Sequence, residues 1–503
     1  MEIEKMSTKK IKPENRATKF LFPAIIALSA CDPAESFTED AEAAAEEHEA
    51  AEDIHEPVGV SFVSLASPVR FELGDNPDPS VLADARELTS IFKGEVGSED
   101  EAALGDGIRP PGGGAAAPSE DELVVEYLGQ AKFEELGDAS QEAPTANEID
   151  SEHADQADAE FGTLVGVNYA TGNMFKITFP PDVLAALASQ SDHEHTGDAD
   201  AGPGDGSEIA EDTEFRGWSN NFDQRQRIYG VNAGVAGVSR WFTQIGGGCS
   251  GSLVGPRHVV TAGHCIYNQS SGAFNDDYVV RIGANGTSSL ASVTIDKDNI
   301  PQGEILWKFV PSGYISTGLW QYDFGILVLP QRVGGSGGGQ AGCFDGQCWF
   351  GWFTYAAASM QNINFWRRGY PRCSVTGRID EPCQTGTWSS FQSCTTAPCN
   401  PNHLYGPSVS CGVGEFEALD PDGWNRVLHH GCDASAGDSG SALYHKNTTY
   451  DDWVITSVQT SQECGANALC PSSPASTLAR PLRDTRITPE YSGYISYFRN
   501  LYP

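Results

Sequence analysis

The stretch HHGCDASAGDSGSALY, residues 429–444, places a serine among small residues directly before an apolar run. Ser439 lies in the pentapeptide GDSGS, where its neighbours leave a hydroxyl group accessible. Gly, Asp and Ser are also the residues of ordinary turns. The pentapeptide is therefore compatible with a nucleophilic serine and with a plain turn. A base and an acid that orients it have to be found elsewhere in the chain to separate the two.

Both kinds of residue occur upstream of this serine. His264 follows an apolar, β-like run in GGGCSGSLVGPRHVVTAGHCIY, residues 246–267. A bridge between Cys249 and Cys265 would tie two neighbouring strands together and hold the backbone of this histidine. Asp323 directly precedes an apolar run in LWQYDFGILVLP, where packing can hold a carboxylate at the edge of a strand. Four other carboxylates remain alternatives for the acid: Asp276, Asp277, Asp296 and Asp298.

Four motifs in this order, CSGSLV, TAGHC, DFGILV and GDSGS, resemble those of the chymotrypsin/trypsin-like serine peptidase family. The resemblance extends from residue 228 to the C-terminus. The stretch 429–444 also resembles bacterial secreted members that are grouped with the glutamyl endopeptidases. The family implies an all-β fold of two antiparallel Greek-key β-barrels with the catalytic cleft between them. Short apolar runs separated by turn residues agree with such a fold, and YSGYISYFRN, residues 491–500, predicts a C-terminal helix.

The resemblance also implies a role for each residue of the site. Ser439 would attack the peptide carbonyl, His264 would take its proton, and Asp323 would orient the imidazole. The backbone N–H groups of Gly437 and Ser439 would form the oxyanion hole. No cofactor and no metal ion are required for this chemistry.

Two other classes of protein were weighed against this interpretation. An α/β-hydrolase would carry the motif GxSxG and the triad order Ser, acid, His. Position 441 is serine, and the order here is His, Asp, Ser, which excludes that class. A peptidase-like domain that only binds partners usually lacks a member of the triad, and here all three are present.

The substrate preference is less clear from the sequence. Asp433 lies six residues before Ser439. In trypsin-like members an aspartate at this spacing lies at the base of the primary pocket and pairs with Lys or Arg. Glutamyl-type relatives use a histidine at a position that falls near Gln459 in this chain. The histidine is missing, so we expect a weak preference for basic residues, with Glu/Asp specificity as the alternative.

The segment Arg227-Ile228-Tyr229-Gly230 resembles the activation site of trypsin-like zymogens. Cleavage after Arg227 would free an apolar N-terminus at Ile228. In the family, Asp438 is the partner of the new amine, and this pair would order the oxyanion loop. The alternative is that Arg227 is an ordinary surface residue and that the pro-region is trimmed elsewhere, for example after Arg216 or Arg225.

The net charge of −38 is concentrated in the first part of the chain, where residues 1–210 hold 45 of the 69 Asp and Glu but only 12 of the 31 Lys and Arg. A segment so acidic repels phosphates, which argues against nucleic-acid binding. A metal site is not expected either, because no CxxC pair occurs and because His193 and His195 lie in an acidic loop where solvated side chains are expected. Twelve of the 13 cysteines lie between residues 249 and 470, as suits an exported domain with disulfides.

The N-terminus predicts export. Six basic residues precede FLFPAIIALSA, an apolar core too short to span a bilayer comfortably. It ends in Leu28-Ser29-Ala30-Cys31, which resembles the bacterial lipobox, where the cysteine is lipidated. The protein would then be a cell-envelope lipoprotein that meets the membrane through this anchor. An ordinary cleaved export signal, giving a secreted protein, is the alternative.

These observations predict four regions. Residues 1–30 form the signal peptide, and residues 31–160 form an acidic, largely disordered spacer. Residues 161–227 form a possible pro-domain and activation linker, in which FGTLVGVNYATGNMFKITFPPDVLAALA reads as strand, turn, strand and short helix. Residues 228–503 form the peptidase domain, with a Cys-rich insertion at about 331–411. The expected partners are protein or peptide substrates and the chain's own pro-region.

Overall fold

The computed structural model describes most of the chain from residue 67 onward. The described residues are 67, 69–74, 76–92, 122–135, 161–189, 225–228, 230–231, 234–235, 237–246, 248–299, 304, 306–335, 341–345, 347–371, 402–407, 410–419, 425–430, 432, 437–462 and 482–503. The signal segment, Cys31, His193, His195 and Asp433 lie outside them. Among the residues described, no helix is long and apolar enough to cross a membrane.

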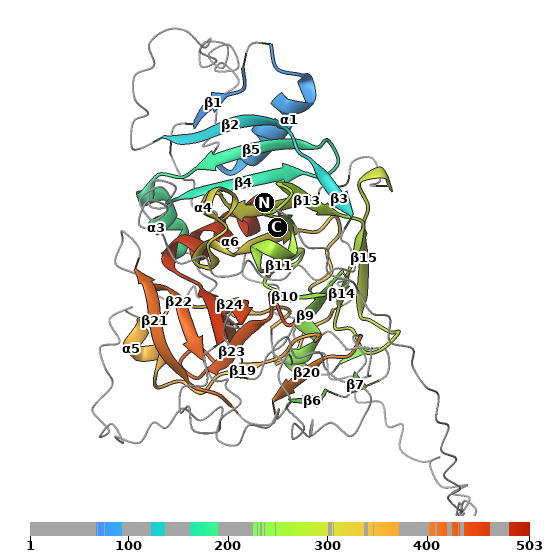
Figure 1. Ribbon diagram of the computed structural model, residues 1–503, viewed down its shortest axis with the longest axis vertical. Helices are drawn as coiled ribbons and strands as arrows, with labels where there is room; N and C mark the ends of the chain where they lie inside the picture. Colours follow the sequence, from blue (N-terminus) through green and yellow to red (C-terminus); the bar gives the residue numbers. More distant parts are fainter. Residues whose placement is uncertain are drawn as a thin grey trace, which may run out of the picture. The chain divides into compact units, whose positions relative to one another are not determined.

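The predicted all-β class is confirmed, because strands carry most of the regular structure of the described residues and helices are few (Figure 1). The larger sheet holds the elements that we expected of the first barrel. Its strands, in spatial order, are β1 (Val69–Glu72), β2 (Leu123–Gln130), β5 (Asn173–Thr178), β4 (Thr163–Asn168), β16 (Trp307–Pro311), β17 (Gly325–Val328), β11 (His258–Thr261), β10 (Cys249–Leu253), β9 (Phe242–Ile245), β14 (Tyr278–Ile282) and β15 (Ala291–Ile295).

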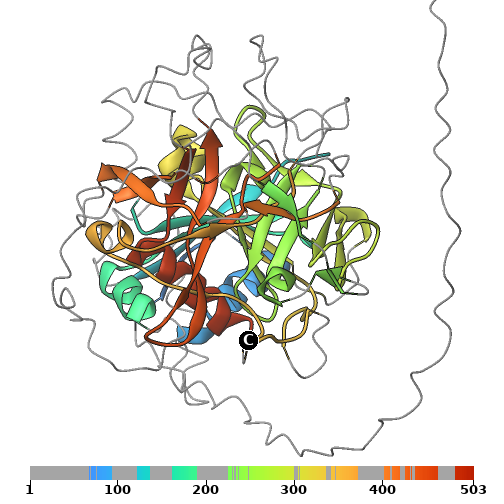
Figure 2. The ribbon, with the colours of Figure 1, turned by 90° about the horizontal axis from the view of Figure 1, so that it is seen from below.

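The second large sheet comes from the C-terminal part of the chain. Its strands are β19 (Trp366–Arg367), β23 (Ala442–Asn447), β24 (Asp452–Gln462), β25 (Leu482–Arg486), β22 (Asn425–His430) and β21 (Val413–Leu419), in that order, and β18 (Gly351–Trp352) pairs with β24. Seen after a quarter turn, the orange and red strands of this sheet lie on one side and the green strands of the first sheet on the other (Figure 2). The four motifs that carry the resemblance are therefore divided between two sheets, as the resemblance implies.

Smaller strand groups and helices complete the structure. β12 (Tyr267–Asn268), β13 (Ala273–Asp276) and β3 (Phe133–Glu135) form one small sheet, β20 (Tyr405–Pro407) pairs with β6 (Arg225–Arg227), and β7 (Gly230–Val231) pairs with β8 (Gly234–Val235). The helices are α1 (Pro79–Leu88), α3 (Pro181–Ser189), α4 (Ser312–Thr317), α5 (Ala357–Met360) and α6 (Pro489–Leu501). Helix α6 confirms the C-terminal helix expected from residues 491–500.

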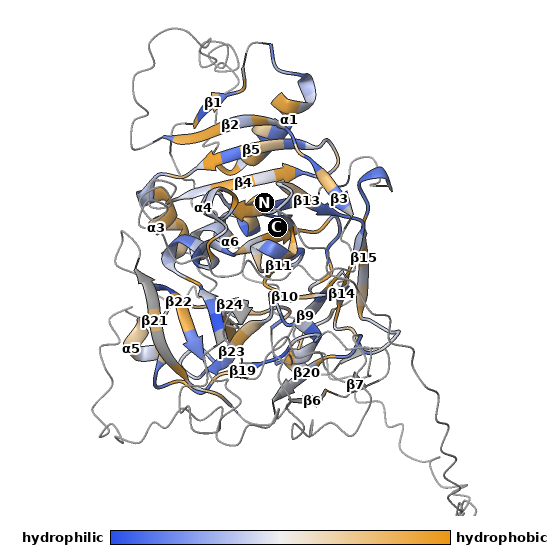
Figure 3. Ribbon diagram, viewed as in Figure 1, coloured by the Kyte–Doolittle hydropathy of each residue, from blue (hydrophilic) through white to orange (hydrophobic). Residues whose placement is uncertain are grey.

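The strand–turn–strand–helix pattern expected for residues 161–188 is present as β4, β5 and α3. The sequence did not reveal that these elements continue the first large sheet. β4 pairs antiparallel with β16 over five residues, from Trp307 opposite Asn168 to Pro311 opposite Leu164. Apolar side chains on β2, β4 and β5 are buried in the core on this part of the sheet (Figure 3). In the described residues, β4 and β5 are therefore strands of the first large sheet and not a sheet of their own.

Ordered elements also occur within the range that composition assigns to the spacer. Helix α1 begins after Asp78, whose side chain accepts the N–H of Ser80, and buries Val81, Ala85 and Leu88. This spacing of one and two helical turns places the three apolar side chains on one face. Strand β2 is paired with both β1 and β5. These short ordered segments are exceptions within residues 31–160, which the composition predicts to be largely, not wholly, disordered.

Part of the expected insertion at about residues 331–411 forms strands of the second large sheet. Within it, β18 and β19 belong to the second large sheet, so the sheet begins earlier in the chain than the motifs indicate. Cys343 is bonded to Cys348, and Cys411 is bonded to Cys432 beyond the insertion. The second bond ties the end of this segment to the strand that leads into the GDSGS loop. Residues 372–401 lie outside the described part.

Candidate active site

Ser439 lies in a loop that two glycines shape, between β22 and β23. Gly437 has φ of 93° and Gly440 has φ of 84°, in the region that side chains disfavour. At residue 440 a Cβ atom would lie 2.1 Å from the carbonyl oxygen of Ser250 and 2.1 Å from the hydroxyl of Thr261. The glycine therefore allows the serine loop to press directly against the first sheet.

Ser250, on β10, fastens the serine loop to the first sheet. Its backbone N–H donates to the Ser439 carbonyl at 2.7 Å, and its hydroxyl donates to the Gly437 carbonyl at 2.8 Å. The Ser250 hydroxyl also accepts the N–H of Tyr370 at 2.8 Å. A loop from the second sheet and a strand from the first are thus joined on both sides of Ser439, which sets the position of its backbone.

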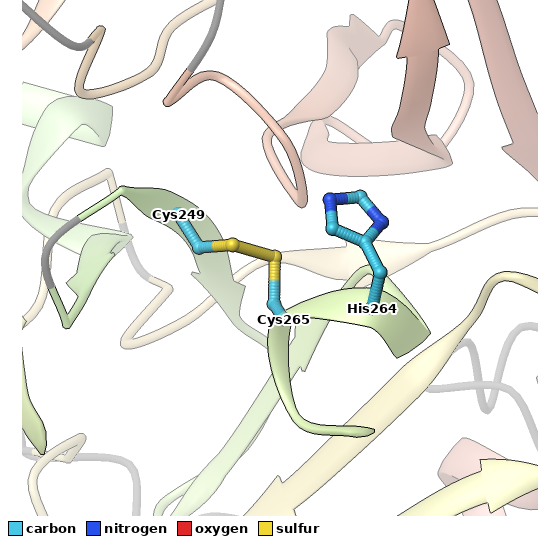
Figure 4. Close-up of side chains that lie close together, drawn as sticks. All are labelled: Cys249, His264 and Cys265. Carbon is cyan, nitrogen blue, oxygen red and sulfur yellow. A yellow bond between two sulfur atoms is a disulfide. The ribbon is translucent and has the colours of Figure 1, made fainter. Parts of the chain in front are cut away.

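His264 lies on a single turn of 3-10 helix, Gly263–Cys265, that follows β11. The adjacent Cys265 is bonded to Cys249 on β10, with an S–S distance of 2.04 Å. Figure 4 shows the disulfide and the imidazole side by side, at the adjacent residues Cys265 and His264 of this turn. The sulfur atoms approach the imidazole closely enough to resemble a metal-ligand cluster, but each is bonded to the other, so neither offers a thiolate. The bridge that we predicted instead anchors the turn.

Asp323 holds His264 at two points. Its Oδ2 oxygen lies 2.7 Å from the imidazole Nδ1 atom, and its Oδ1 oxygen accepts the backbone N–H of His264 at 2.8 Å. Both side chains are buried. A Cβ at residue 263 would lie 3.1 Å from the same Oδ1 atom, so Gly263 leaves room for the carboxylate to approach. The pair fixes Nδ1 as the protonated nitrogen and directs Nε2 away from the acid.

The other candidate carboxylates have different partners. Asp276 accepts a hydrogen bond from the Tyr169 hydroxyl and from the backbone N–H groups of Asp277 and Lys297. Asp296 caps the N–H of Asp298, whose own side chain is 85% exposed. The hydrogen bonds of His264 are with Asp323, as the sequence pattern indicated.

The Nε2 atom of His264 is buried and has no hydrogen-bond partner among the described residues, which include Ser439. The Ser439 carbonyl oxygen nevertheless lies 3.7 Å from the sulfur of Cys265, the neighbour of His264. The serine backbone is therefore next to the histidine turn. A hydrogen bond between the serine hydroxyl and Nε2 is absent here, and such bonds are often long in free enzymes. A buried basic nitrogen without a partner is the atom that a proton transfer would use.

Gln459 lies on β24, beside the serine loop. Its carbonyl accepts the N–H of Gly440 and its N–H donates to the carbonyl of Ser441, each at 2.8 Å. The side chain is buried and bears no charge. The wall of the expected pocket is thus neutral at this position, and Asp433 at its expected base is outside the described part of the chain.

A buried charged cluster, which the sequence analysis missed, lies on the strand opposite Gln459. Asp484 is the cross-strand neighbour of Gln459. Its carboxylate accepts hydrogen bonds from Arg367 at 2.6 Å, His430 Nε2 at 2.8 Å and the Ser457 hydroxyl at 2.7 Å. The Asp484 carboxylate is thus paired with three polar side chains where water is excluded, as a buried charge requires, whereas Nε and Nη1 of Arg367 have no hydrogen-bond partner among the described residues.

The protonation states in this cluster follow from burial and from the arginine. Burial opposes ionisation of Asp484, but Arg367 and His430 outweigh it and lower the pKa of Asp484 to about 2. Burial and the nearby Arg367 together lower the pKa of His430 to about 4. His430 is therefore neutral near pH 7, with its proton on Nε2 and its Nδ1 accepting the N–H of Cys432 at 3.1 Å. Only the doublet of histidines before Gly431 hinted at this in the sequence.

The expected activation residues lie close together. β6, which ends at Arg227, pairs with β20, and the N–H of Ile228 donates to the Leu404 carbonyl at 2.8 Å. Tyr405 of β20 also exchanges two hydrogen bonds with Gly369. A Cβ on Gly369 would lie 2.4 Å from the carboxylate of Asp438, which is itself buried. Two strand spacings, about 10 Å, therefore separate the Arg227 backbone from the neighbourhood of Asp438.

Comparison with known proteins identifies similar sequences. Residues 228–348, which include His264 and Asp323 but not Ser439, match the family model Trypsin. A glutamyl endopeptidase from Bacillus licheniformis is 34% identical over 133 residues, which are 26% of this chain and 35% of that protein. The clotting factor G beta subunit of Tachypleus tridentatus is 27% identical over 202 residues, 40% of this chain and 58% of the subunit.

This chain spans only about a third to somewhat more than half of the length of these two curated relatives. Among solved structures, one of a Glu endopeptidase in complex with MPD covers 55% of this chain and 97% of its own, with 18% identity and a TM-score of 0.36.

Proposed function

We propose that this chain, a chymotrypsin/trypsin-like serine peptidase by its family match over residues 228–348, hydrolyses peptide bonds through His264, Asp323 and Ser439. The observation that carries the proposal is the double contact of Asp323 with His264, which leaves a buried, unpartnered Nε2 atom on a turn whose next residue, Cys265, has its sulfur 3.7 Å from the Ser439 carbonyl oxygen. Other buried histidines, such as His258 and His445, also leave one ring nitrogen without a hydrogen-bond partner in the described part of the chain, so it is the double contact with Asp323 that distinguishes His264.

The reaction follows the acyl-enzyme route. The Ser439 hydroxyl attacks the peptide carbonyl while His264 Nε2 accepts its proton. Asp323 stabilises the resulting imidazolium through Nδ1 and keeps its own negative charge. The imidazolium then gives the proton to the leaving amine, and water hydrolyses the acyl-enzyme by the same proton transfers. The N–H groups of Gly437 and Ser439 bind the oxyanion, and each such donor is worth roughly 3–4 kcal/mol.

The substrates are proteins or peptides, with a weak preference for Lys or Arg before the cleaved bond. Asp433 is the residue that would attract a basic side chain, and the neutral Gln459 wall supports no preference for acidic side chains. Specificity for Glu or Asp is the alternative, because a glutamyl endopeptidase is among the similar proteins.

The enzyme is made as a zymogen. Cleavage after Arg227 frees the amine of Ile228, which forms an ion pair with Asp438 and orders the loop that holds Gly437. The short path from β6 through β20 and Gly369 to Asp438 supports this route. Trimming at Arg216 or Arg225 is the alternative.

The chain is exported, and Cys31 carries the lipid anchor. A Cys31→Ala protein would then leave the membrane fraction.

The function is tested with a fluorophosphonate probe and a peptide library, on protein that lacks residues 1–30 and has been cleaved after Arg227. We expect the probe to label Ser439 and the library to be cleaved. Ser439→Ala should abolish both, with turnover lower by roughly four to six orders of magnitude, because triad members act as a unit. The exposed Ser271→Ala is the matched control. A folded wild-type protein that is neither labelled nor active would instead be a binding module.

A further inference from the structure

Residues 67–189, here called the upstream segment, cover two surfaces of the peptidase region. One is the edge of the sheet at β16, and the other is a face of helix α6. At the edge, β16 pairs with β4 through five consecutive residues, and every residue of β4 is buried. Trp307 and Phe309, on β16, are fully buried. The ring of Phe309 fits against Gly166, where a Cβ would lie only 2.1 Å from a ring atom. The two strands are therefore matched in shape as well as in hydrogen bonding.

The helix face belongs to α6 at the C-terminus. Phe179 of the upstream segment contacts the rings of Tyr494 and Tyr497, with centroids 5.5 and 4.9 Å apart. Phe92 stacks on Tyr497 at 5.8 Å. A Cβ at residue 493 would lie 2.9 Å from the carbonyl of Leu184, so helices α3 and α6 touch closely. The aromatic face of α6 is thus buried by the upstream segment.

Hydrogen bonds from polar groups complete the contact. Glu490 on α6 accepts the N–H of Gly162 at 2.9 Å and pairs with the buried Arg426 of β22 at 2.6 Å. Glu87 of the upstream segment accepts the Trp307 indole N–H at 3.1 Å and the Tyr502 hydroxyl at 2.7 Å. The upstream segment thereby supplies hydrogen-bond partners to polar groups on β16, on α6 and at Tyr502, directly after α6.

A buried lysine adds a contact with Tyr169 of the upstream segment. Lys308 on β16 has its ammonium 4.0 Å from the centre of the Tyr169 ring, and the Tyr169 hydroxyl donates to Asp276. Burial lowers the pKa of Lys308 well below its usual value. Removal of Tyr169 would take a packing partner from both side chains.

We propose that residues 67–189 remain bound to the peptidase after the activation cleavage, so that the active enzyme consists of two chains held by non-covalent contacts. The proposal rests on the cleavage near residue 227 described above. Residues 32–248 contain no cysteine, so no disulfide can link this part of the chain to the peptidase. Its loss would expose the aromatic surface of β16 and α6, and contiguous apolar patches of that kind are rare on free soluble proteins.

The test uses the full chain after the signal, with Ser439→Ala and a recognition sequence for a specific protease inserted within residues 196–210. The added protease makes the cut, so retention is measured whether or not the chain has peptidase activity. After the cut, we expect both fragments to co-elute on size exclusion at micromolar concentration and to appear as a one-to-one complex in native mass spectrometry. They should separate only in denaturant.

Two variants test the interface itself. Gly166→Val should weaken retention by about tenfold or more, because overpacking of a tight contact is destabilising. Gly412→Ala is the matched control, since its new Cβ meets no atom within 4 Å. The proposal is overturned if the upstream fragment of the Ser439→Ala protein separates under native conditions. It is also overturned if the peptidase that has lost the fragment keeps its unfolding temperature.

Discussion

The carboxylate of Asp323 binds His264 twice, at the ring nitrogen Nδ1 and at the backbone N–H. The second contact means that the carboxylate positions the main chain of the histidine as well as its ring. Rotation of the imidazole would break the hydrogen bond at Nδ1, while the bond to the backbone N–H would still hold the carboxylate in place. The geometry therefore fixes the orientation of the imidazole, with Nε2 on the side away from Asp323, before any substrate arrives.

Asp323→Asn should lower kcat by about 10⁴-fold near neutral pH, because an amide N–H directed at Nδ1 favours the wrong imidazole tautomer. The variant should still fold, since the amide has the same shape. Steady-state kinetics and the unfolding temperature measure the two effects. Asp298→Asn, at an 85% exposed side chain, is the control and should retain full activity. Equal activity of both variants would exclude Asp323 as the orienting acid.

Gly440→Ala should damage both stability and activity. The new Cβ would overlap the carbonyl of Ser250, and φ of 84° is strained for alanine. We expect a loss of about 1–3 kcal/mol in the free energy of unfolding, as for other overpacked sites. Denaturant titration and probe labelling of Ser439 report the two losses. Gly248→Ala, where nothing lies within 4 Å, should be neutral; a neutral result at residue 440 would contradict the close contact of the loop.

His430→Gln should remove a pH dependence of stability. The unfolded chain takes up a proton on this histidine near pH 6.5, whereas the folded chain does so only near a pKa of about 4. The free energy of unfolding therefore falls as the pH drops from about 6.5 to about 4, by about 3 kcal/mol for this one group. Denaturant titrations across this range should show a shallower fall for the variant. Parallel curves for the two proteins would rule out a neutral, buried His430.

Asp438→Asn should leave activation cleavage intact but lower activity, because the amine of Ile228 would lack its charged partner. Breaking a buried pair by removing one member costs about 3–5 kcal/mol, which is enough to disorder the oxyanion loop. N-terminal sequencing of the active form and kinetics of the variant measure the two steps. An active enzyme that begins well upstream of Ile228, or a variant with full activity, would exclude this mechanism.

The sequence by itself determined the chemical class of the candidate site. The order of the four motifs indicated His264, Asp323 and Ser439, and the structure brings the first two into contact and the third next to them. The all-β class, the C-terminal helix and the elements at residues 161–188 were also predictable. These features depend on short local patterns, such as apolar alternation and turn residues, that act over a few residues.

Only the tertiary structure decided how distant segments meet. The Asp484–His430 contact joins residues 54 apart in the chain, and the Phe309–Gly166 fit joins two strands on either side of the expected cleavage site. The bond between Cys411 and Cys432 is of the same kind. No local pattern marks such contacts, because burial and partner choice depend on which surfaces the whole chain brings together. The strands and the helix at residues 161–188 could be recognised from the sequence, but their partners on β16 and α6 could not.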